Sequence, residues 1–186
     1  RLCVRRLAES VKQPCSLNRL SNLIKATGTP CSPSTVMEYV RYLQESCLLI
    51  SIDNYVSKFV EKKTIKKHYF VDNGLLHLFI NNPNTSLLEN LCAITLYKKY
   101  AKGLYYYNRN IEVDFYVPDE GIAVQASYQM SDGETIEREV KALVALHGLH
   151  PLKRAMIITY EDEGEIVRDG LRIEIRPAWK WVLEGL

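Results

Sequence analysis

The chain has 186 residues, a formal net charge of +2, and 47% hydrophobic and 25% charged residues, a composition that excludes an intrinsically disordered chain. It contains no run of about 18 apolar residues, so we expect no membrane span and a cytoplasmic location. Its five cysteines are far apart and form no C-x-x-C pair, which argues against a disulfide framework and against a zinc site.

Charge is distributed unevenly along the sequence. Residues 1–72 hold 12 basic and 6 acidic residues, a formal charge of +6, whereas residues 73–186 hold 12 basic and 16 acidic residues, a formal charge of −4. A basic half joined to an acidic half predicts two domains with different partners. We therefore expect one domain over residues 1–72 and a second over residues 73–186.

The basic half is predicted to begin with three helices, at residues 1–12, 17–26 and 33–46, from the spacing of its apolar residues. Ser16 and Ser32 are suitable N-caps, Pro33 suits a first helical position, and Gly28 suits a helix end. Strands are expected at residues 48–52 and 66–71, with residues 55–65 between them. A helix-turn-helix followed by such a hairpin indicates a winged helix over residues 1–72.

The residues expected to contact DNA lie on the third helix and on the wing. The third helix would present Ser34, Thr35, Glu38, Arg41 and Tyr42 to the major groove, and the wing would present Lys58, Lys62 and Lys63 to phosphates. That face of the helix carries one Arg and two Glu, which is unfavourable for a groove reader. Packing of the winged helix on a neighbouring domain therefore stays an alternative to DNA binding.

The acidic half is predicted to be a mixed α/β domain. A turn at Asn73-Gly74 precedes a helical piece at residues 75–80, and an amphipathic helix follows at residues 86–101. Three short strands lie between residues 105 and 127, and a capping box from Ser131 to Glu134 opens a helix that extends to His147. Strands at residues 155–159 and 171–175 and a helix from Pro177 complete the domain. Its core order is α-β-β-β-α-β.

The second and third of the short strands place polar side chains on one face. Glu112, Asp114 and Tyr116 alternate with apolar residues, so a period of two puts them on the same side of their strand. In the next strand the same period groups Gln125 with Ser127. If the two strands pair, Asp114, Gln125 and Ser127 share one polar surface.

This arrangement resembles the PD-(D/E)XK nuclease fold. In that fold an Asp on one strand and an acid-x-Lys on the next hold a divalent metal and steady the nucleophile and the developing phosphate charge. Here Asp114 is present, but Gln125 replaces the acid and Ser127 replaces the lysine. The resemblance therefore implies a vestigial site with weak Mg²⁺ ligands, Asp114 and Glu89, because an amide oxygen adds no charge for a hard cation.

Two residues have alternative roles that the sequence leaves open. Glu89 lies in the opening helix, where the first acid of the fold often sits, but Ser86-x-x-Glu89 is also a capping box. Lys141 is a candidate for a displaced catalytic lysine, but it also forms an i, i+4 pair with Glu137 on a solvated helix face. For Lys141 we favour the surface pair.

The wider sequence resembles the C-terminal region of a large family of prokaryotic AAA-type ATP-binding proteins. The resemblance rests on Tyr69-Phe-Val-Asp-Asn-Gly-Leu-Leu76, Leu88-Glu-Asn90, Tyr105-Tyr-Tyr107, Glu112-Val-Asp-Phe115, Ile158-Thr159 and Pro177-x-Trp179. It implies a winged helix and a nuclease-like domain that follow an ATPase domain. No G-x-x-x-x-G-K-[ST] motif is present, so ATP would bind only to a missing N-terminal domain.

Three functional hypotheses follow from these patterns. The first is a non-catalytic accessory module of an AAA-type ATPase, whose partners are the ATPase domain of the same protein and DNA or another protein. The second is a metal-dependent DNA nuclease that uses Glu89, Asp114 and a displaced lysine. The third is an interaction scaffold with no nucleic-acid role. A homo-oligomer is compatible with each, and none requires a membrane.

Overall fold

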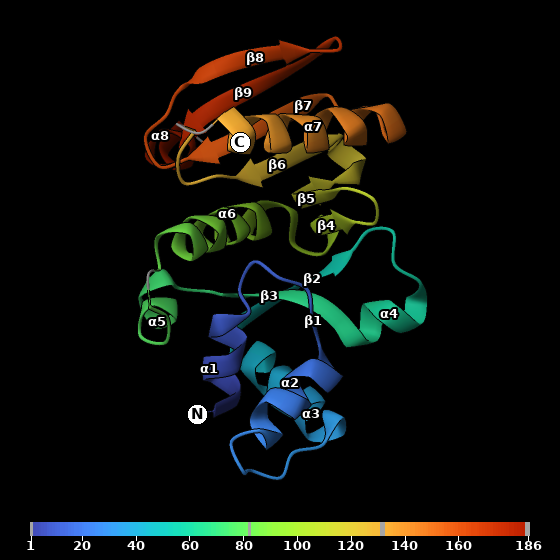
Figure 1. Ribbon diagram of the computed structural model, residues 1–186, viewed down its shortest axis with the longest axis vertical. Helices are drawn as coiled ribbons and strands as arrows, with labels where there is room; N and C mark the ends of the chain where they lie inside the picture. The colour runs from blue at the N-terminus through green and yellow to red at the C-terminus, as the bar shows by residue number, and fades with distance from the viewer. Residues whose placement is uncertain (1, 82, 131–132, 185–186) are drawn as a thin grey trace. The chain divides into compact units, whose positions relative to one another are not determined.

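The computed structural model describes residues 2–81, 83–130 and 133–184 and divides the chain into two compact units, residues 1–94 (unit 1) and 95–186 (unit 2). Each unit combines helices with a sheet (Figure 1), so the predicted mixed α/β class is confirmed. The division falls inside helix α6, Asn84–Tyr100. The capping box predicted at Ser131–Glu134 includes residues outside the described part of the chain.

Unit 1 begins with three helices that precede its main strands. Its elements are α1 (Leu2–Glu9), β1 (Cys15–Ser16), α2 (Leu17–Lys25), α3 (Pro33–Glu45), β2 (Leu49–Asn54), α4 (Phe59–Thr64), β3 (Ile65–Phe70), α5 (Asn73–His77) and the first part of α6. The strands are antiparallel in the order β1-β3-β2. The first three helices pack on one another around fully buried Leu7, Leu20 and Val36, which stabilises the unit by the removal of apolar surface from water.

The predicted starts of α2 and α3 are confirmed by their cap geometry. The Ser16 hydroxyl accepts a hydrogen bond from the Arg19 backbone N–H at 3.1 Å, and the Ser32 hydroxyl accepts one from Thr35 at 3.1 Å. Pro33 occupies the first turn of α3. These caps satisfy backbone donors that have no partner within the helix.

Four local predictions in unit 1 differ from the structure. The wing segment contains the short helix α4, and β1 was not predicted. Asn73-Gly74 is not a turn: it starts α5, because the Asp72 carboxylate accepts the Leu75 N–H at 3.0 Å and caps a helix there. The spacing of apolar residues in the third helix also placed Tyr39 on the same stripe as Val36 and Val40, but Tyr39 is exposed, whereas Val36 and Val40 are buried.

Residues 73–94 belong to unit 1, whereas the sequence placed the division after residue 72. Asn90 of α6 accounts for this assignment. Its side chain accepts the Phe70 N–H at 2.8 Å and donates to the Phe70 carbonyl at 2.9 Å and to Asn73 Oδ1 at 2.8 Å. The start of α6 is thus fixed to the end of β3 by one buried amide whose donor and acceptor atoms are both used.

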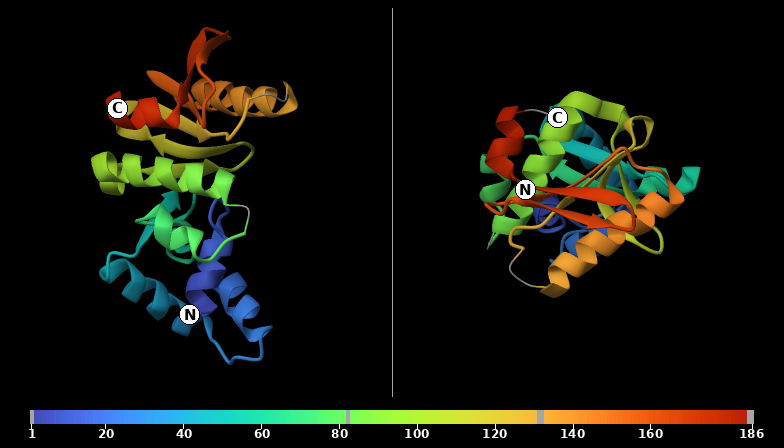
Figure 2. Two further views of the ribbon diagram at one scale, coloured as in Figure 1. Left: turned by 90° about the vertical axis from the view of Figure 1, so that its left-hand side faces the viewer. Right: turned by 90° about the horizontal axis from the view of Figure 1, so that it is seen from above.

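Unit 2 is a mixed sheet with helices on both faces. After the last turns of α6 it contains β4 (Tyr105–Asn108), β5 (Glu112–Val117), β6 (Ile122–Ala126), α7 (Gly133–Leu149), β7 (Arg154–Thr159), β8 (Gly164–Arg168), β9 (Leu171–Pro177) and α8 (Ala178–Glu184). The strand order is β4-β5-β6-β7-β9-β8, with β6, β7 and β9 parallel and the other pairs antiparallel. Figure 2 shows α7 on one face of this sheet and α8 on the other.

The predicted order of helices and strands in this half is largely confirmed. Helix α6 starts at Asn84 rather than at Ser86, and β8 is an additional strand that pairs with β9. The Pro118–Gly121 turn is a short 3₁₀ turn closed by Gly121, whose φ is 62° and where a Cβ would lie 3.2 Å from the Lys153 nitrogen. Gly121 also accepts the Lys153 N–H at 2.8 Å and so connects this turn to the start of β7.

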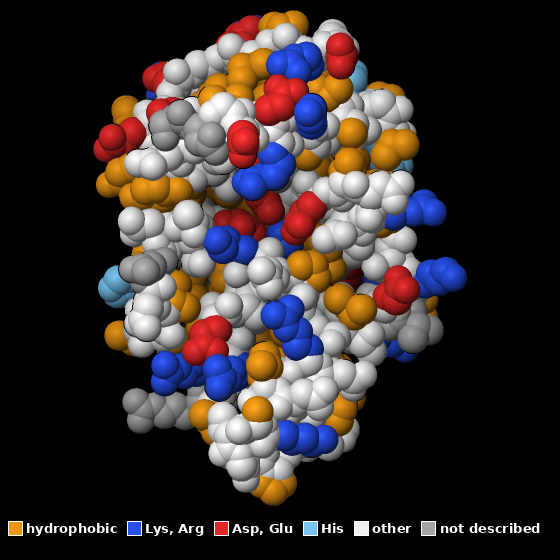
Figure 3. Space-filling model, viewed as in Figure 1, with side chains coloured by type: hydrophobic (Ala, Val, Ile, Leu, Met, Phe, Trp, Pro, Cys, Tyr) orange, Lys and Arg blue, Asp and Glu red, His pale blue; other side chains and the backbone are white. Residues whose placement is uncertain are grey.

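Side chains of both charges occur on the surface of the molecule. On the face shown in Figure 3, basic and acidic side chains lie beside one another at many points. Among the residues that the structure describes, none belongs to a helix of the length and hydropathy needed to cross a membrane.

Candidate functional site

The polar face predicted in unit 2 is formed by β5 and β6. These strands pair with Phe115 opposite Val124 and Tyr116 opposite Ala123, a register that brings Asp114 beside Gln125. Antiparallel partners direct their side chains to the same side of the sheet. The alternation in the sequence therefore predicted correctly that Asp114 and Gln125 lie side by side.

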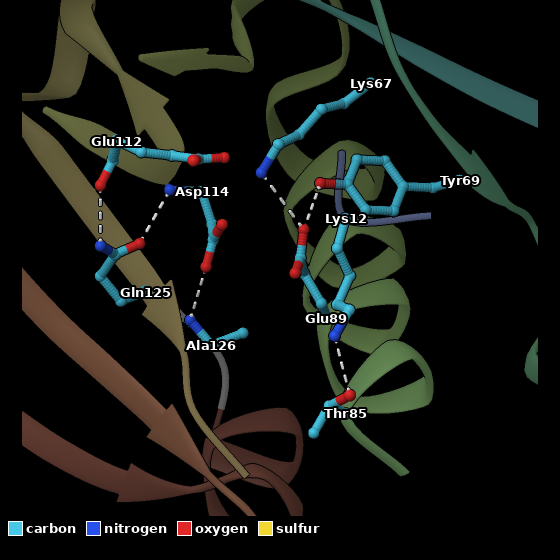
Figure 4. A network of polar contacts seen from close by, with 9 residues as sticks. All are labelled: Lys12, Lys67, Tyr69, Thr85, Glu89, Glu112, Asp114, Gln125 and Ala126. Atoms are coloured by element: carbon cyan, nitrogen blue, oxygen red, sulfur yellow. Dashed lines mark hydrogen bonds and ion pairs between the residues drawn. The ribbon is translucent and has the colours of Figure 1, made fainter. Parts of the chain in front are cut away.

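Gln125 connects the two strands with both ends of its amide (Figure 4). Its Oε1 accepts the Asp114 backbone N–H at 2.8 Å, and its Nε2 donates to the Glu112 carbonyl at 3.0 Å. The residue is 3% exposed. A glutamate has the acceptor but, when ionised, lacks the donor that this geometry requires. At the position where the nuclease resemblance expects an acid, the side chain bonds to the backbone.

The neighbouring positions are bonded in a similar way. The Asp114 carboxylate accepts the Ala126 backbone N–H at 3.1 Å, and the Ser127 hydroxyl donates to the Gln129 carbonyl at 3.2 Å. Ser127 is buried. Ser127 therefore supplies no positive charge where the resemblance expects a lysine.

Glu139 of α7 is a buried acid that faces this surface and that the sequence interpretation did not assign to it. Burial raises the pKa of its carboxyl, Arg138 opposes the shift, and the charges of Asp114 and Glu112 raise it further. Arg138 donates to Glu139 Oε1 at 2.6 Å. Three carboxylates therefore make the region around Asp114 acidic, and the arginine that pairs with Glu139 comes from the same helix, α7.

Lys141 lies away from that surface. It is two residues from Glu139, and a helix turns by about 200° over two residues, so the two side chains leave α7 on opposite sides. The Lys141 side chain is 71% exposed and its Nζ lies 3.5 Å from Glu137 Oε1. This geometry is that of the i, i+4 surface pair considered from the sequence.

Glu89 does not form the predicted capping box. Helix α6 begins two residues before Ser86. Ser86 is therefore inside the helix and cannot be the N-cap residue whose backbone N–H a capping box would satisfy. Instead, Glu89 Oε1 accepts a hydrogen bond from the Tyr69 hydroxyl at 2.8 Å and lies 3.4 Å from Lys67 Nζ (Figure 4). Glu89 is therefore bonded to β3 of its own unit.

Lys67 is the most unusual cation of unit 1. Its side chain is fully buried, and burial of a lysine requires a paired charge. Lys67 and Tyr69 are two residues apart on β3 and so reach Glu89 from the same face of that strand. A buried acid, a buried lysine and a phenol thus form one cluster in unit 1.

The sequence carries a signal for each of the two residues that were overlooked. Glu139 lies on the apolar stripe of its helix, three residues after Ile136 and four before Leu143, where a charged residue is rare unless it is paired. Lys67 alternates with Tyr69 in a strand whose last four residues are buried. An acid on an apolar helix stripe and a lysine in a buried strand are the patterns that could have indicated these sites.

No metal centre is evident from ligand geometry. Within residues 2–81, 83–130 and 133–184, no group of three or more His, Cys, Asp or Glu side chains is placed to hold a metal ion. The weak Mg²⁺ ligands expected from the sequence, Asp114 and Glu89, belong to unit 2 and unit 1 respectively. Their joint role stays a prediction.

The residues predicted to read DNA from α3 are exposed or half-buried, but several are bonded within the helix. Ser34 and Thr35 hydroxyls lie 2.7 and 2.8 Å from the Ser32 hydroxyl that caps α3. Arg41 donates to Glu45 at 3.1 Å and lies over the Tyr42 ring at 4.9 Å. Glu38 is exposed and adds a negative charge.

The lysines predicted to touch phosphates lie on or beside α4. Lys58 immediately precedes the helix and Lys62 and Lys63 are in its last turn. The Lys58 backbone N–H donates to Glu61 Oε2 at 3.2 Å, which satisfies one donor at the start of the helix. These lysines therefore project from a helical element rather than from an open loop.

His68 of β3 gives unit 1 a predictable dependence on pH. Burial, with a smaller effect of the Lys66 charge, lowers the pKa of His68 from 6.5 to about 4, and its Nδ1 lies 2.8 Å from the Ser51 hydroxyl. Above pH 6.5 the imidazole is neutral in both the folded and the unfolded state, so the folded state has its full stability. As the pH falls toward 4 the unfolded chain takes up the proton first, so roughly 3 kcal/mol of stability is lost.

We expect His68→Gln to flatten the decrease in unfolding free energy between pH 6.5 and pH 4, measured by urea titration at several pH values. His77→Gln is the matched control, because His77 is exposed on α5. A pH profile of His68→Gln parallel to that of the wild type would contradict the assignment.

The chain is similar to sequences that are described without a function. A family model described as "Domain of unknown function (DUF8612)" matches residues 1–86. The "Uncharacterized protein MJ1544" of Methanocaldococcus jannaschii is 32% identical over 185 residues, which cover 90% of this chain. The chain spans about 40% of the length of that archaeal relative. No match is found among solved structures.

Proposed function

We propose that this chain is a non-catalytic accessory module of an AAA-type ATP-binding protein, with a DNA-contacting winged helix in unit 1 and a nuclease-like domain without cleavage chemistry in unit 2. The observation that carries the proposal is the double hydrogen bond of Gln125 to the Asp114 N–H and the Glu112 carbonyl. That bonding gives the residue at the expected acid position a structural role. Ser127, at the expected lysine position, is bonded to the Gln129 carbonyl.

The order of elements supports both halves of the proposal. In unit 1, the order α1-β1-α2-α3-β2-α4-β3, with a helix-turn-helix followed by the antiparallel pair β2-β3, supports a winged helix whose wing contains the short helix α4. In the second half, α6-β4-β5-β6-α7-β7 is the α-β-β-β-α-β order that the nuclease resemblance implies. The link to an ATPase rests on the sequence resemblance, and the archaeal relative contains further sequence outside the matched region.

One observation favours a metal-dependent nuclease as the second candidate. Glu89 has no capping role and has a buried lysine, Lys67, 3.4 Å from its carboxylate. If the chain cleaves DNA, Lys141 is an unfavourable displaced lysine, because its side chain is exposed and paired with Glu137. This alternative still lacks the acid that Gln125 replaces.

A plasmid assay with Mg²⁺ or Mn²⁺ separates the two candidates. We expect no cleavage above background by the wild type and the same background for Asp114→Ala, because the acid and the lysine of the nuclease motif are both replaced. Cleavage by the wild type that disappears in Asp114→Ala would overturn the non-catalytic proposal. Activity that survives Asp114→Ala would be assigned to a contaminating nuclease.

DNA binding is tested separately by gel shift. We expect binding at low salt that weakens as the salt concentration rises, because lysine contacts with phosphates release counterions. No shift even at low salt would remove DNA from the proposal and favour a protein partner for unit 1.

A further inference from the structure

Phe59, at the start of α4, is the most exposed aromatic side chain in the described part of the chain. The exposed fraction of Phe59 is 72%. Exposing a large apolar ring in the wing segment gives up the stabilisation that its burial would provide. A phenyl ring has no hydrogen-bonding atom, so its contribution to recognition is contact through its face or edge.

Three lysines lie close to this ring in the sequence, and one of them contacts it. Lys62 and Lys63 follow Phe59 by three and four residues, so they lie on its side of the helix. Lys63 Nζ lies 4.4 Å from the centre of the Phe59 ring, and Lys58 directly precedes it. In Figure 3, basic side chains project from the edge of unit 1 where Figure 1 labels α4.

Helix α3 offers a contrasting surface. Its single arginine, Arg41, is bonded to Glu45, and Glu38 leaves the helix with more negative than positive charges. A phosphate backbone is therefore attracted to α4 and not to α3. The apolar ring together with lysines is the combination found where proteins stack on bases and hold the adjacent phosphates.

From these observations we infer that α4 is a binding surface for single-stranded DNA, with Phe59 stacked on a base and Lys58, Lys62 and Lys63 on the phosphates. This inference rests on the proposed DNA-binding function of unit 1 and specifies its surface and its ligand. Single strands are favoured because their bases are already accessible, whereas a duplex must be unstacked before a phenyl ring reaches a base face.

The test is fluorescence anisotropy of the full 186-residue chain with a labelled oligothymidylate and with the matching duplex, at low and moderate salt. We expect the wild type to bind the single strand more tightly than the duplex. Phe59→Leu, which keeps an apolar side chain and removes the aromatic face, should weaken binding of the single strand roughly tenfold. Replacing the three lysines by Gln should reduce the slope of log K against log salt by about 2.

Trp179→Leu on α8, which removes another exposed aromatic ring, and Lys25→Gln on α2, which removes another exposed lysine, are the matched controls, and both should bind as the wild type does. Far-ultraviolet circular dichroism and thermal unfolding verify that each variant is folded. Unchanged binding by Phe59→Leu, an equal loss in Trp179→Leu, or equal affinity for duplex and single strand would overturn the inference while leaving DNA binding by the chain intact. Absence of binding to either DNA at low salt would instead reject the proposed function and the inference together.

Discussion

Gln125→Glu is expected to lower the free energy of unfolding of unit 2 by about 3 kcal/mol at neutral pH. The substitution is nearly isosteric, and the remaining Oε1 still accepts the Asp114 N–H. It removes the donor that meets the Glu112 carbonyl at 3.0 Å and places a carboxylate oxygen against a carbonyl oxygen in a buried position. Urea and thermal unfolding, followed by circular dichroism, measure the loss.

Gln129→Glu is the control for the change in charge, because Gln129 is exposed in the same unit and its substitution should alter stability by less than about 0.5 kcal/mol. Protonation of the introduced carboxylate restores a donor, so the difference between Gln125→Glu and wild type should shrink as the pH is lowered. Equal stability of Gln125→Glu and wild type at neutral pH would show that the amide is not needed. It would also remove the main support for a non-catalytic unit 2.

The same amide arrangement occurs in unit 1, where Asn90 bonds to the N–H and the carbonyl of Phe70. In both units an amide replaces a strand partner: it gives the main chain one donor and one acceptor from a single side chain. In the sequence, such a residue is only a polar position in or beside an apolar run. Nothing in the pattern shows which groups its side chain bonds. Pattern alone therefore predicted Gln125 as part of a polar face but not as a bond to the backbone.

Local chemistry determined which parts of the fold were predictable. Serine caps, the proline after Ser32 and the period of two in β5 act over a few residues, so α2, α3 and the three central strands were expected close to where they lie. The two strands that were missed, β1 and β8, are a two-residue strand and a mostly exposed strand at the sheet edge. Neither strand has a pattern of buried apolar residues that a sequence would show. Each is defined by its pairing with β3 or β9.

The sites depended on contacts that are distant in sequence. Ser86-x-x-Glu89 satisfies the local rule for a capping box, but α6 starts at Asn84, so the carboxylate is available to β3. The partners of Glu89, Lys67 and Tyr69, are 22 and 20 residues away. A motif of four residues contains no information about a strand that packs against it, which is why the role of Glu89 stayed open until the fold was known.

Lys67→Met is expected to be among the most destabilising single substitutions in unit 1, with a loss of about 3–5 kcal/mol. Methionine fills a similar volume, so the loss arises from charge rather than from a cavity. It leaves the Glu89 carboxylate, itself 4% exposed, without the lysine that lies 3.4 Å from it. Urea unfolding at neutral pH measures the change.

Lys66→Met provides the neighbouring control. Lys66 is only half-buried and pairs with Asp53 at 2.7 Å, so its loss should cost about 1 kcal/mol or less. If Lys67→Met lowers the free energy of unfolding several times more than Lys66→Met, the effect of burial is separated from the effect of removing a positive charge from unit 1.

A double-mutant cycle with Glu89→Gln isolates the interaction between the two buried charges. The double variant Lys67→Met/Glu89→Gln should be more stable than the sum of the single losses predicts, by about 1–3 kcal/mol, because no uncompensated charge is then buried. Glutamine retains an acceptor for the Tyr69 hydroxyl, so that hydrogen bond is preserved across the cycle. If the single losses simply add, or if Lys67→Met costs no more than Lys66→Met, then Lys67 and Glu89 do not stabilise each other, and neither residue is held in place by the other.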